Sequence, residues 1–242
     1  MADPKLVTVL PDPAALAAAA ADHVVEVLQA TLAQRAVAHV ALAGGSTPRA
    51  INALLTAVPR RATVDWSRVV FWFGDERCVP PDDEQSNYKM NRETLLDPLG
   101  INAAHIHRMH GEDDPSAAAA DYDAILRREA GEQPRLDLVL LGMGPDGHTA
   151  SLFPGTTGAI GHDKLCIAHY VPKLNAWRMT LTPHAINAAR NVAITAGGAE
   201  KADALHAVLN GPKQPDVYPS QLVRPAHGEL RWFVDEAAAS KL

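Results

Sequence analysis

Short apolar runs alternate with longer alanine-rich segments along most of this chain. The apolar runs have the length of buried strands and cover residues 6–10, 37–42, 69–73, 136–141, 165–171 and 192–195. The longer segments are typical of helices and cover residues 13–34, 48–57, 88–96, 116–130 and 200–209. Strands that alternate with helices predict an α/β fold with a mainly parallel sheet covered by helices.

Three other segments refine this fold. Residues 177–182 (WRMTLT) alternate apolar with polar side chains, which predicts a half-exposed strand added antiparallel to the sheet. Residues 211–225 are rich in proline and are expected to form an irregular surface segment. Trp232, Phe233 and Val234 follow them, so the chain is expected to return to the core there. We expect residues 1–242 to form a single domain.

Composition and charge limit the function classes. With 47% hydrophobic and 21% charged residues, the chain has an ordinary globular composition. The net charge of −6 argues against broad binding to nucleic acid or to a membrane, so a bound anion needs a local cluster of donors. Cys78 and Cys166 fit neither a zinc spacing nor a disulfide framework, which favours reduced thiols and a cytoplasmic location. Residues 14–21 resemble a signal-peptide core, but acidic Asp12 and Asp22 flank them and favour a helix.

The sharpest candidate for chemistry lies after the apolar run at 136–141. That run ends in a loop containing Gly142, Gly144 and Gly147, which predicts a buried strand breaking into a tight turn. Asp146 and His148 lie in the loop, and both are suited to proton transfer near neutral pH. Ligands of open α/β sheets bind at the carboxyl ends of strands, so this loop is a candidate active site.

A second loop has the composition of a phosphate cradle. Residues 41–49 (ALAGGSTPR) follow one predicted strand and precede a helix, and the N–H groups at a helix N-terminus bind phosphate. The loop is neither a Walker A nor a GxGxxG motif. The alternative is an ordinary turn in which Ser46 or Thr47 caps the helix.

Charged residues follow two further predicted strands. Asp75, Glu76 and Arg77 come directly after the strand at 69–73, and Arg77 offers the bidentate guanidinium fork that the glycine-rich loop lacks. The alternative is a solvated turn. After the strand at 192–195, Gly197 and Gly198 lead to Lys201 in the first turn of a helix. A lysine at such a position can equally be a solvated helix residue.

His105, His107 and His110 lie close together and raise the question of a metal site. Their spacing is not of the HExxH type and no set of cysteine or carboxylate ligands accompanies them. We therefore expect no metal.

Five motifs, in this order, resemble those of the family of 6-phosphogluconolactonases and glucosamine-6-phosphate isomerases or deaminases. They are LAGGSTP at 42–48, FGDER at 73–77 with Ser86 and Asn87, GMGPDGHTASLFP at 142–154, RMTLT at 178–182 and GGAEKADAL at 197–205. They cover most of the chain. The approach to RMTLT departs from the family's proline-rich pattern, which leaves the role of Lys173 open.

The resemblance implies a Rossmann-like α/β sandwich that hydrolyses 6-phospho-D-glucono-1,5-lactone to 6-phosphogluconate without metal or organic cofactor. His148 is then the general base and later returns the proton to the departing ring oxygen, and backbone N–H groups of the 142–147 loop stabilise the oxyanion. Asp146 orients either His148 or the substrate, and Asp75 completes the catalytic set. The expected substrate-binding residues are Gly44, Gly45, Ser46, Thr47, Arg77, Gly144, Arg178 and Lys201. The expected partner is a small sugar-phosphate lactone, and the expected assembly is a monomer or weak homodimer.

Two rival functions share these residues. An amino-sugar-phosphate isomerase or deaminase would use the same fold and phosphate site, but its loop continues from the histidine toward a glutamate, and here no acid follows before Asp163. A non-catalytic sugar-phosphate sensor would be favoured by loss of His148 or Asp75, and both are present. A covalent serine hydrolase is disfavoured because neither Ser46 nor Ser151 lies in a G-x-S-x-G elbow.

Overall fold

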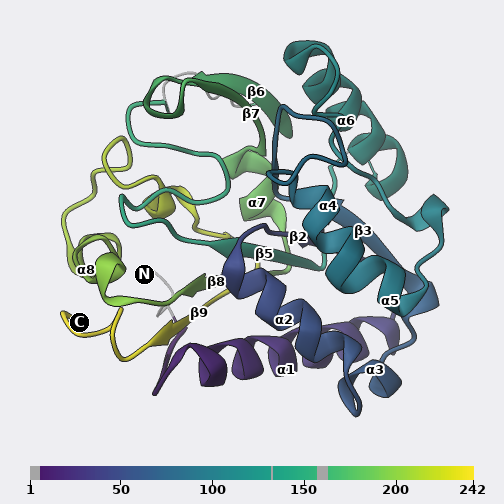
Figure 1. Ribbon diagram of the computed structural model, residues 1–242, viewed down its shortest axis with the longest axis horizontal. Helices are drawn as coiled ribbons and strands as arrows, with labels where there is room; N and C mark the ends of the chain where they lie inside the picture. The colour runs from purple at the N-terminus through teal and green to yellow at the C-terminus, as the bar shows by residue number, and fades with distance from the viewer. Residues whose placement is uncertain (1–5, 132, 157–162) are drawn as a thin grey trace.

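A computed structural model describes residues 6–131, 133–156 and 163–242 (Figure 1). Its centre is a six-stranded sheet with the order β1-β9-β8-β5-β2-β3, in which every neighbouring pair is parallel. The strands are β1 (Leu6–Leu10), β2 (Ala38–Leu42), β3 (Val69–Phe73), β5 (Leu138–Gly142), β8 (Asn191–Ala196) and β9 (Glu229–Asp235). The predicted parallel sheet is confirmed, and the return of the C-terminal segment to the core takes the form of β9.

Several helices begin at a proline that follows a capping side chain. Asp12, Asp114 and Thr182 each accept a hydrogen bond from a first-turn N–H group, and proline suits the first helical position because it has no N–H to satisfy. These helices are α1 (Pro13–Leu32), α6 (Pro115–Ala130) and α7 (Pro183–Ala188). The others are α2 (Ser46–Thr56), α3 (Arg60–Thr63), α4 (Asn87–Asn91), α5 (Asp97–Leu99) and α8 (Ala202–Asn210). The predicted helix at 88–96 is α4 followed by a π-helical turn at Arg92–Leu96.

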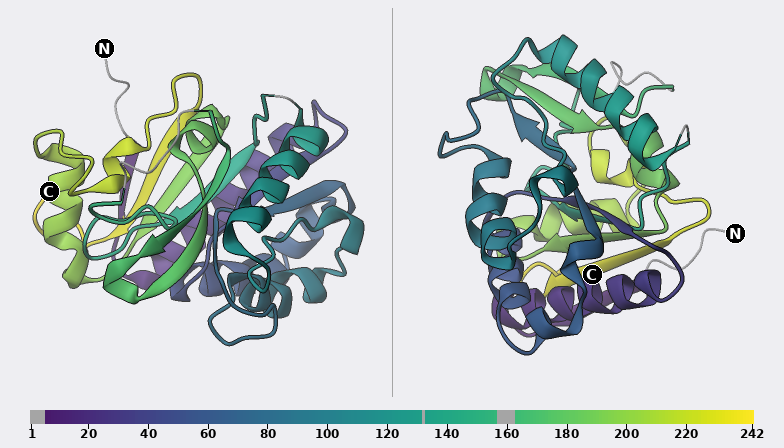
Figure 2. Two further views of the ribbon diagram at one scale, coloured as in Figure 1. Left: turned by 90° about the horizontal axis from the view of Figure 1, so that it is seen from above. Right: turned by 90° about the vertical axis from the view of Figure 1, so that its right-hand side faces the viewer.

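The sheet separates two hydrophobic clusters. One lies between the sheet and α1 with α2, and the other lies between the sheet and α6, α7 and α8; Figures 1 and 2 show these helices on opposite faces. Helix α1 is long and apolar enough to cross a membrane by length and composition, but half of its apolar span is buried inside the fold. It is therefore accounted for as a core helix that covers one face of the sheet.

A second, smaller sheet is antiparallel and has the order β4-β7-β6. Its strands are β4 (Asp75–Arg77), β6 (Cys166–Val171) and β7 (Ala176–Leu181). The antiparallel strand predicted at 177–182 is thus confirmed, in a sheet of its own. The expectation that 165–171 belongs to the parallel sheet is wrong. A four-residue connection links β6 to β7, and so short a connection forces antiparallel pairing.

The strand order creates one place where loops diverge. From β2 the chain passes to β3 on one side, whereas β5, on the other side of β2, is followed outward by β8 and β9. The carboxyl ends of β2 and β5 therefore flank a topological switch point, where open α/β sheets bind ligands. The glycine-rich loop after β2 and the Asp146–His148 loop after β5 both lie there.

Candidate active site

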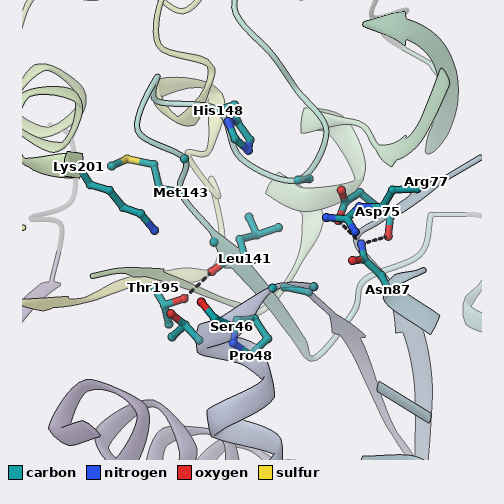
Figure 3. A pocket seen from close by; sticks show the side chains of 17 residues that line it. Ser46, Pro48, Asp75, Arg77, Asn87, Leu141, Met143, His148, Thr195 and Lys201 are labelled. Atoms are coloured by element: carbon teal, nitrogen blue, oxygen red, sulfur yellow. Dashed lines mark hydrogen bonds between the residues drawn. The ribbon is translucent and has the colours of Figure 1, made fainter. Parts of the chain in front are cut away.

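A cavity of about 240 Å³ opens at the carboxyl ends of β2, β3, β5 and β8 (Figure 3). His148 and Lys201 border it on two sides, Ser46 lies opposite His148, and Asp75 with Arg77 and Asn87 closes the side away from Lys201. Of the residues predicted from the sequence, the cavity wall contains Gly44, Gly45, Ser46, Thr47, Asp75, Arg77, Gly144, His148 and Lys201. Asp146 and Arg178 are not among the described wall residues.

The N-terminus of α2 faces this cavity without a side-chain cap. Within the described part of the chain, no side chain caps the helix at Gly45, whose φ of 105° suits only glycine. The alternative of a turn capped by Ser46 or Thr47 is therefore wrong. The N–H groups of Ser46 and Thr47 belong to the first helical turn, where no intrahelical acceptor exists. They lie where the helix dipole favours an anion.

Gly44 is required by a close approach to Asn87. A Cβ atom at Gly44 would lie 1.7 Å from Asn87 Oδ1. Asn87 also lines the cavity, and its Nδ2 donates to the backbone oxygen of Asp75 at 2.9 Å and to Asp75 Oδ1 at 3.1 Å. Asn87 is a site residue that the prediction omitted, although the motif match at Ser86 and Asn87 marked it.

Glu76 holds the Asp75–Arg77 strand against the start of α4. Its side chain is 2% exposed. Its carboxylate accepts hydrogen bonds from Ser86 Oγ at 3.0 Å and from the backbone N–H groups of Asn87 at 2.8 Å, Tyr88 at 2.7 Å and Arg77 at 2.8 Å. Burial raises the pKa of Glu76, and these backbone hydrogen bonds oppose that rise. The alternative of a solvated charged turn is therefore wrong.

Asp75 connects the β4 side of the cavity with the loop after β5. Its Oδ2 accepts a hydrogen bond from Ser151 Oγ at 2.7 Å, and the backbone oxygen of Ser151 lies 2.7 Å from His169 Nε2. Burial lowers the pKa of His169, which favours the neutral imidazole as donor to that carbonyl oxygen. Asp75 is thus fixed at the wall of the cavity by partners from two loops.

His148 is held on three sides. Its Nδ1 lies 2.5 Å from Asp146 Oδ1, its ring stacks on Phe153 with centroids 4.3 Å apart, and Gly144 lies so close that an added Cβ would be 2.0 Å from its Cε1. With Nδ1 directed at Asp146, the other ring nitrogen, Nε2, is the one available to the cavity that the ring lines. This is the arrangement expected of a general base.

Asp146 is ionised down to a low pH. Burial alone would raise its pKa, but hydrogen bonds from Lys173 and His148 outweigh it and lower the pKa to about 2. The carboxylate therefore acts on the Nδ1 side of the ring, away from the cavity. This position favours orientation of His148 over contact with the substrate.

The expectation that N–H groups of the 142–147 loop stabilise an oxyanion meets a difficulty. The N–H groups of Met143, Gly144 and Gly147 already donate to the carbonyl oxygens of Thr195, His148 and Gly144, at 3.1, 2.9 and 3.0 Å. Pro145 has no N–H, and Gly142 is part of the β5 ladder. The Gly144 and Gly147 donors hold the shape of the loop and the Met143 donor joins it to β8. None of the three is free to stabilise an oxyanion, so the prediction is wrong for these three N–H groups.

Lys201 reaches the cavity from the turn after β8. Burial lowers the pKa of Lys201 by more than the nearby charges of Glu200 and Asp235 raise it. Asp235, 1% exposed, accepts the Gly198 N–H at 2.9 Å and thereby fixes the turn that carries the lysine. Asp235 is a supporting residue that sequence reasoning missed.

The remaining candidates lie apart from the cavity. Arg178 lies opposite Arg77 in the antiparallel register of β4 and β7. Burial lowers the pKa of Arg178, and the positive charge of Arg77 lowers it further.

His107, His110 and the two cysteines lie apart from the cavity as well. His107 stacks on Trp72 with centroids 4.2 Å apart, and His110 Nδ1 lies 3.5 Å from Asp113. The described residues contain no group of three or more potential metal ligands. Both cysteines are free thiols, and burial raises the pKa of Cys78 to about 11.

Comparison with known proteins gives consistent results. The model of the family "Glucosamine-6-phosphate isomerases/6-phosphogluconolactonase" matches residues 11–232. A 6-phosphogluconolactonase of Treponema pallidum is 41% identical over 81% of this chain and 82% of its own length, and one of Nostoc is 38% identical over 98% of both chains. The solved structure of 6-phosphogluconolactonase from Trypanosoma brucei superposes with a TM-score of 0.86, at 31% identity and 98% coverage of both chains.

Proposed function

The chain belongs to the glucosamine-6-phosphate isomerase/6-phosphogluconolactonase family, and on this premise we propose that it hydrolyses 6-phospho-D-glucono-1,5-lactone to 6-phospho-D-gluconate. The observation that carries the proposal is a cavity with two chemically different ends. The uncapped N-terminus of α2 lies at one end and His148 lies at the other, and Lys201 and Arg77 flank the cavity on opposite sides between them. A phosphorylated lactone needs an anion site and a base, separated by the length of the sugar.

The phosphate is bound at the first end. The N–H groups of Ser46 and Thr47 donate to its oxygens, as helix N-termini do. Arg77 is anchored through one guanidinium N–H to the Gln85 backbone oxygen, and it supplies charge-assisted hydrogen bonds from the side of β4. Lys201 supplies a point charge from the side of β8.

The reaction takes place at the second end. Asp146 holds the Nδ1–H tautomer of His148 by accepting a hydrogen bond from Nδ1–H. Nε2 is therefore unprotonated and accepts a proton from a water molecule. The water oxygen forms a bond to the lactone carbonyl carbon and a tetrahedral oxyanion results. When the intermediate collapses, the bond from that carbon to the ring oxygen breaks, and His148 returns the proton to the ring oxygen. The products are a hydroxyl group and a carboxylic acid that ionises.

Asp75 is positioned to bind a substrate hydroxyl. Its carboxylate is a wall residue fixed by Asn87 and Ser151. A hydroxyl of the sugar between the phosphate and the lactone carbonyl can donate to it. Gly144 contributes by leaving room for the His148 ring, and Arg178 contributes positive charge behind Arg77.

The rest of the proposal follows the family relationship. The chain acts as one domain over residues 1–242, as a monomer or weak homodimer in the cytoplasm, in the oxidative pentose phosphate pathway. It takes a small sugar phosphate as substrate and needs neither nucleic acid, membrane, metal nor organic cofactor.

A comparison of two substrates tests the proposal. We expect the protein to accelerate loss of freshly prepared 6-phosphogluconolactone above its spontaneous hydrolysis, and to release no ammonia from glucosamine 6-phosphate. Ammonia release without lactone hydrolysis would favour the isomerase or deaminase alternative. Binding of the sugar phosphates without turnover of either would favour a sensor.

A further inference from the structure

Lys173 contacts the active site from a different sheet. It lies in the short turn Pro172–Leu174 that joins β6 to β7, and its Nζ donates to Asp146 Oδ2 at 2.8 Å. Asp146 Oδ1 is the atom that holds His148 Nδ1. The two oxygens of one carboxylate thus connect a lysine of the small sheet with the histidine of the cavity.

The turn that carries Lys173 is braced by its own hairpin. Asn175 adopts the left-handed conformation with φ of 49°, and its side-chain oxygen accepts a hydrogen bond from the Tyr170 hydroxyl. The Tyr170 ring packs edge-on against Trp177, with centroids 6.0 Å apart. These contacts fix the path of the turn, so Lys173 is presented to Asp146 by a defined piece of backbone.

Lys173 has little to offer as a stabilising ion pair or as a ligand. Its side chain is 66% exposed, and exposed ion pairs contribute little to stability. It is also absent from the described wall of the cavity. Its position suits action through Asp146. An unpaired carboxylate beside an imidazole favours the protonated ring, and a cation on the far side of the carboxylate opposes that effect.

We propose that Lys173 is a positioning residue that acts on His148 through Asp146. By partly compensating the negative charge of the Asp146 carboxylate, it leaves His148 unprotonated and able to act as a base at lower pH than beside a free carboxylate. This inference rests on the proposed function. The other charged groups on the cavity are Asp75, Arg77 and Lys201. Tyr218 packs against Gly147, which lies in the same loop as Asp146 and His148. They are unchanged in the variants below, so a difference between variants isolates Lys173.

The test is the pH profile of kcat/KM for lactone hydrolysis, corrected for spontaneous hydrolysis. Removal of the charge in Lys173→Ala is expected to move the acidic limb to higher pH by about half to one unit, which corresponds to a rate roughly three- to tenfold lower on that limb. KM is expected to change little. Lys173→Arg, which keeps the charge, is expected to restore the profile. The shift is expected to shrink in about 1 M salt, because an exposed charge is screened there.

Two further variants make the test specific. Lys164→Ala removes another exposed lysine, near the start of β6, and is expected to leave the limb in place. In an Asp146→Asn background, Lys173→Ala is expected to produce no additional shift, because the carboxylate through which the lysine acts is gone.

The possible failures are distinguishable. If the wild type does not accelerate lactone hydrolysis, the proposed function fails before any variant is compared. If the wild type is active and the Lys173→Ala profile overlays it, or if Lys164→Ala shifts it equally, the inference about Lys173 is wrong. A shift that persists in the Asp146→Asn background, or a raised KM with an unmoved limb, would contradict action through Asp146.

Discussion

Replacement of Gly144 by alanine tests the placement of the His148 ring. Gly144 has an ordinary backbone conformation, unlike the glycines with positive φ, so the backbone tolerates alanine. The added Cβ, however, would lie 2.0 Å from His148 Cε1 and 2.1 Å from Nδ1. Ordinary contact begins at 3.4 Å, so the ring must retreat by about 1.4 Å, and its contacts with Asp146 and Phe153 must change. A misplacement of about 1 Å at a reacting group can lower the rate about 10²-fold.

We therefore expect Gly144→Ala to lower kcat for lactone hydrolysis about 10²-fold with little change in KM, because the phosphate end of the cavity is not involved. Gly74→Ala is the matched control. It lies at the end of β3, its added Cβ meets neighbours at 3.5 Å or more, and its activity is expected to remain near wild type. Wild-type kcat in a correctly folded Gly144→Ala protein would refute the placement of His148, or its need in the reaction.

Three further predictions concern the phosphate end, the metal question and pH. Arg77→Ala is expected to lower kcat/KM roughly ten- to a hundredfold, since a charge-assisted hydrogen bond contributes about 1.5 to 3 kcal/mol; unchanged hydrolysis would show that the anion site is misassigned. Prolonged EDTA treatment is expected to leave the rate intact, and a loss restored by zinc would instead implicate His105, His107 and His110. The pKa of Asp146 is lowered to about 2 in the folded protein, below its value of about 4 in the unfolded chain. The ionised carboxylate therefore contributes its full stabilisation above about pH 4, and this contribution is lost as the pH falls toward 2. The difference in melting temperature between wild type and Asp146→Asn should accordingly shrink between about pH 4 and pH 2, and a constant difference would contradict the ion-paired state of Asp146.

The sequence alone was sufficient to predict the parallel sheet and to identify the loops that meet at the switch point. Buried parallel strands are apolar along their whole length, and the β5 run at 138–141 followed by glycine shows this pattern. Because carboxyl ends of parallel strands lie at one edge, the chemistry-bearing loops after β2, β3, β5 and β8 had to come together.

Elements stabilised by distant partners were not predictable in the same way. Strand β4 consists of Asp75, Glu76 and Arg77. Three consecutive charged residues are typical of a solvated turn. It is buried because residues 86–88 supply donors to Glu76. The pairing of Lys173 with Asp146 depends on how two separate sheets meet. The hydrogen bonds of the Gly144 and Gly147 N–H groups within their own loop depend on its detailed conformation. Neither leaves a local pattern in the sequence.

The role of His148 as general base is tested by a proton NMR time course of fresh 6-phosphogluconolactone with wild-type protein, with His148→Asn and without protein. A positioned base typically contributes about 10²- to 10⁴-fold. We expect rapid loss of the lactone with wild type, and a kcat lower by that order for a correctly folded His148→Asn protein, with little change in KM. Near wild-type hydrolysis by His148→Asn would contradict this role, and the base would then have to be Asp75 or Asp146.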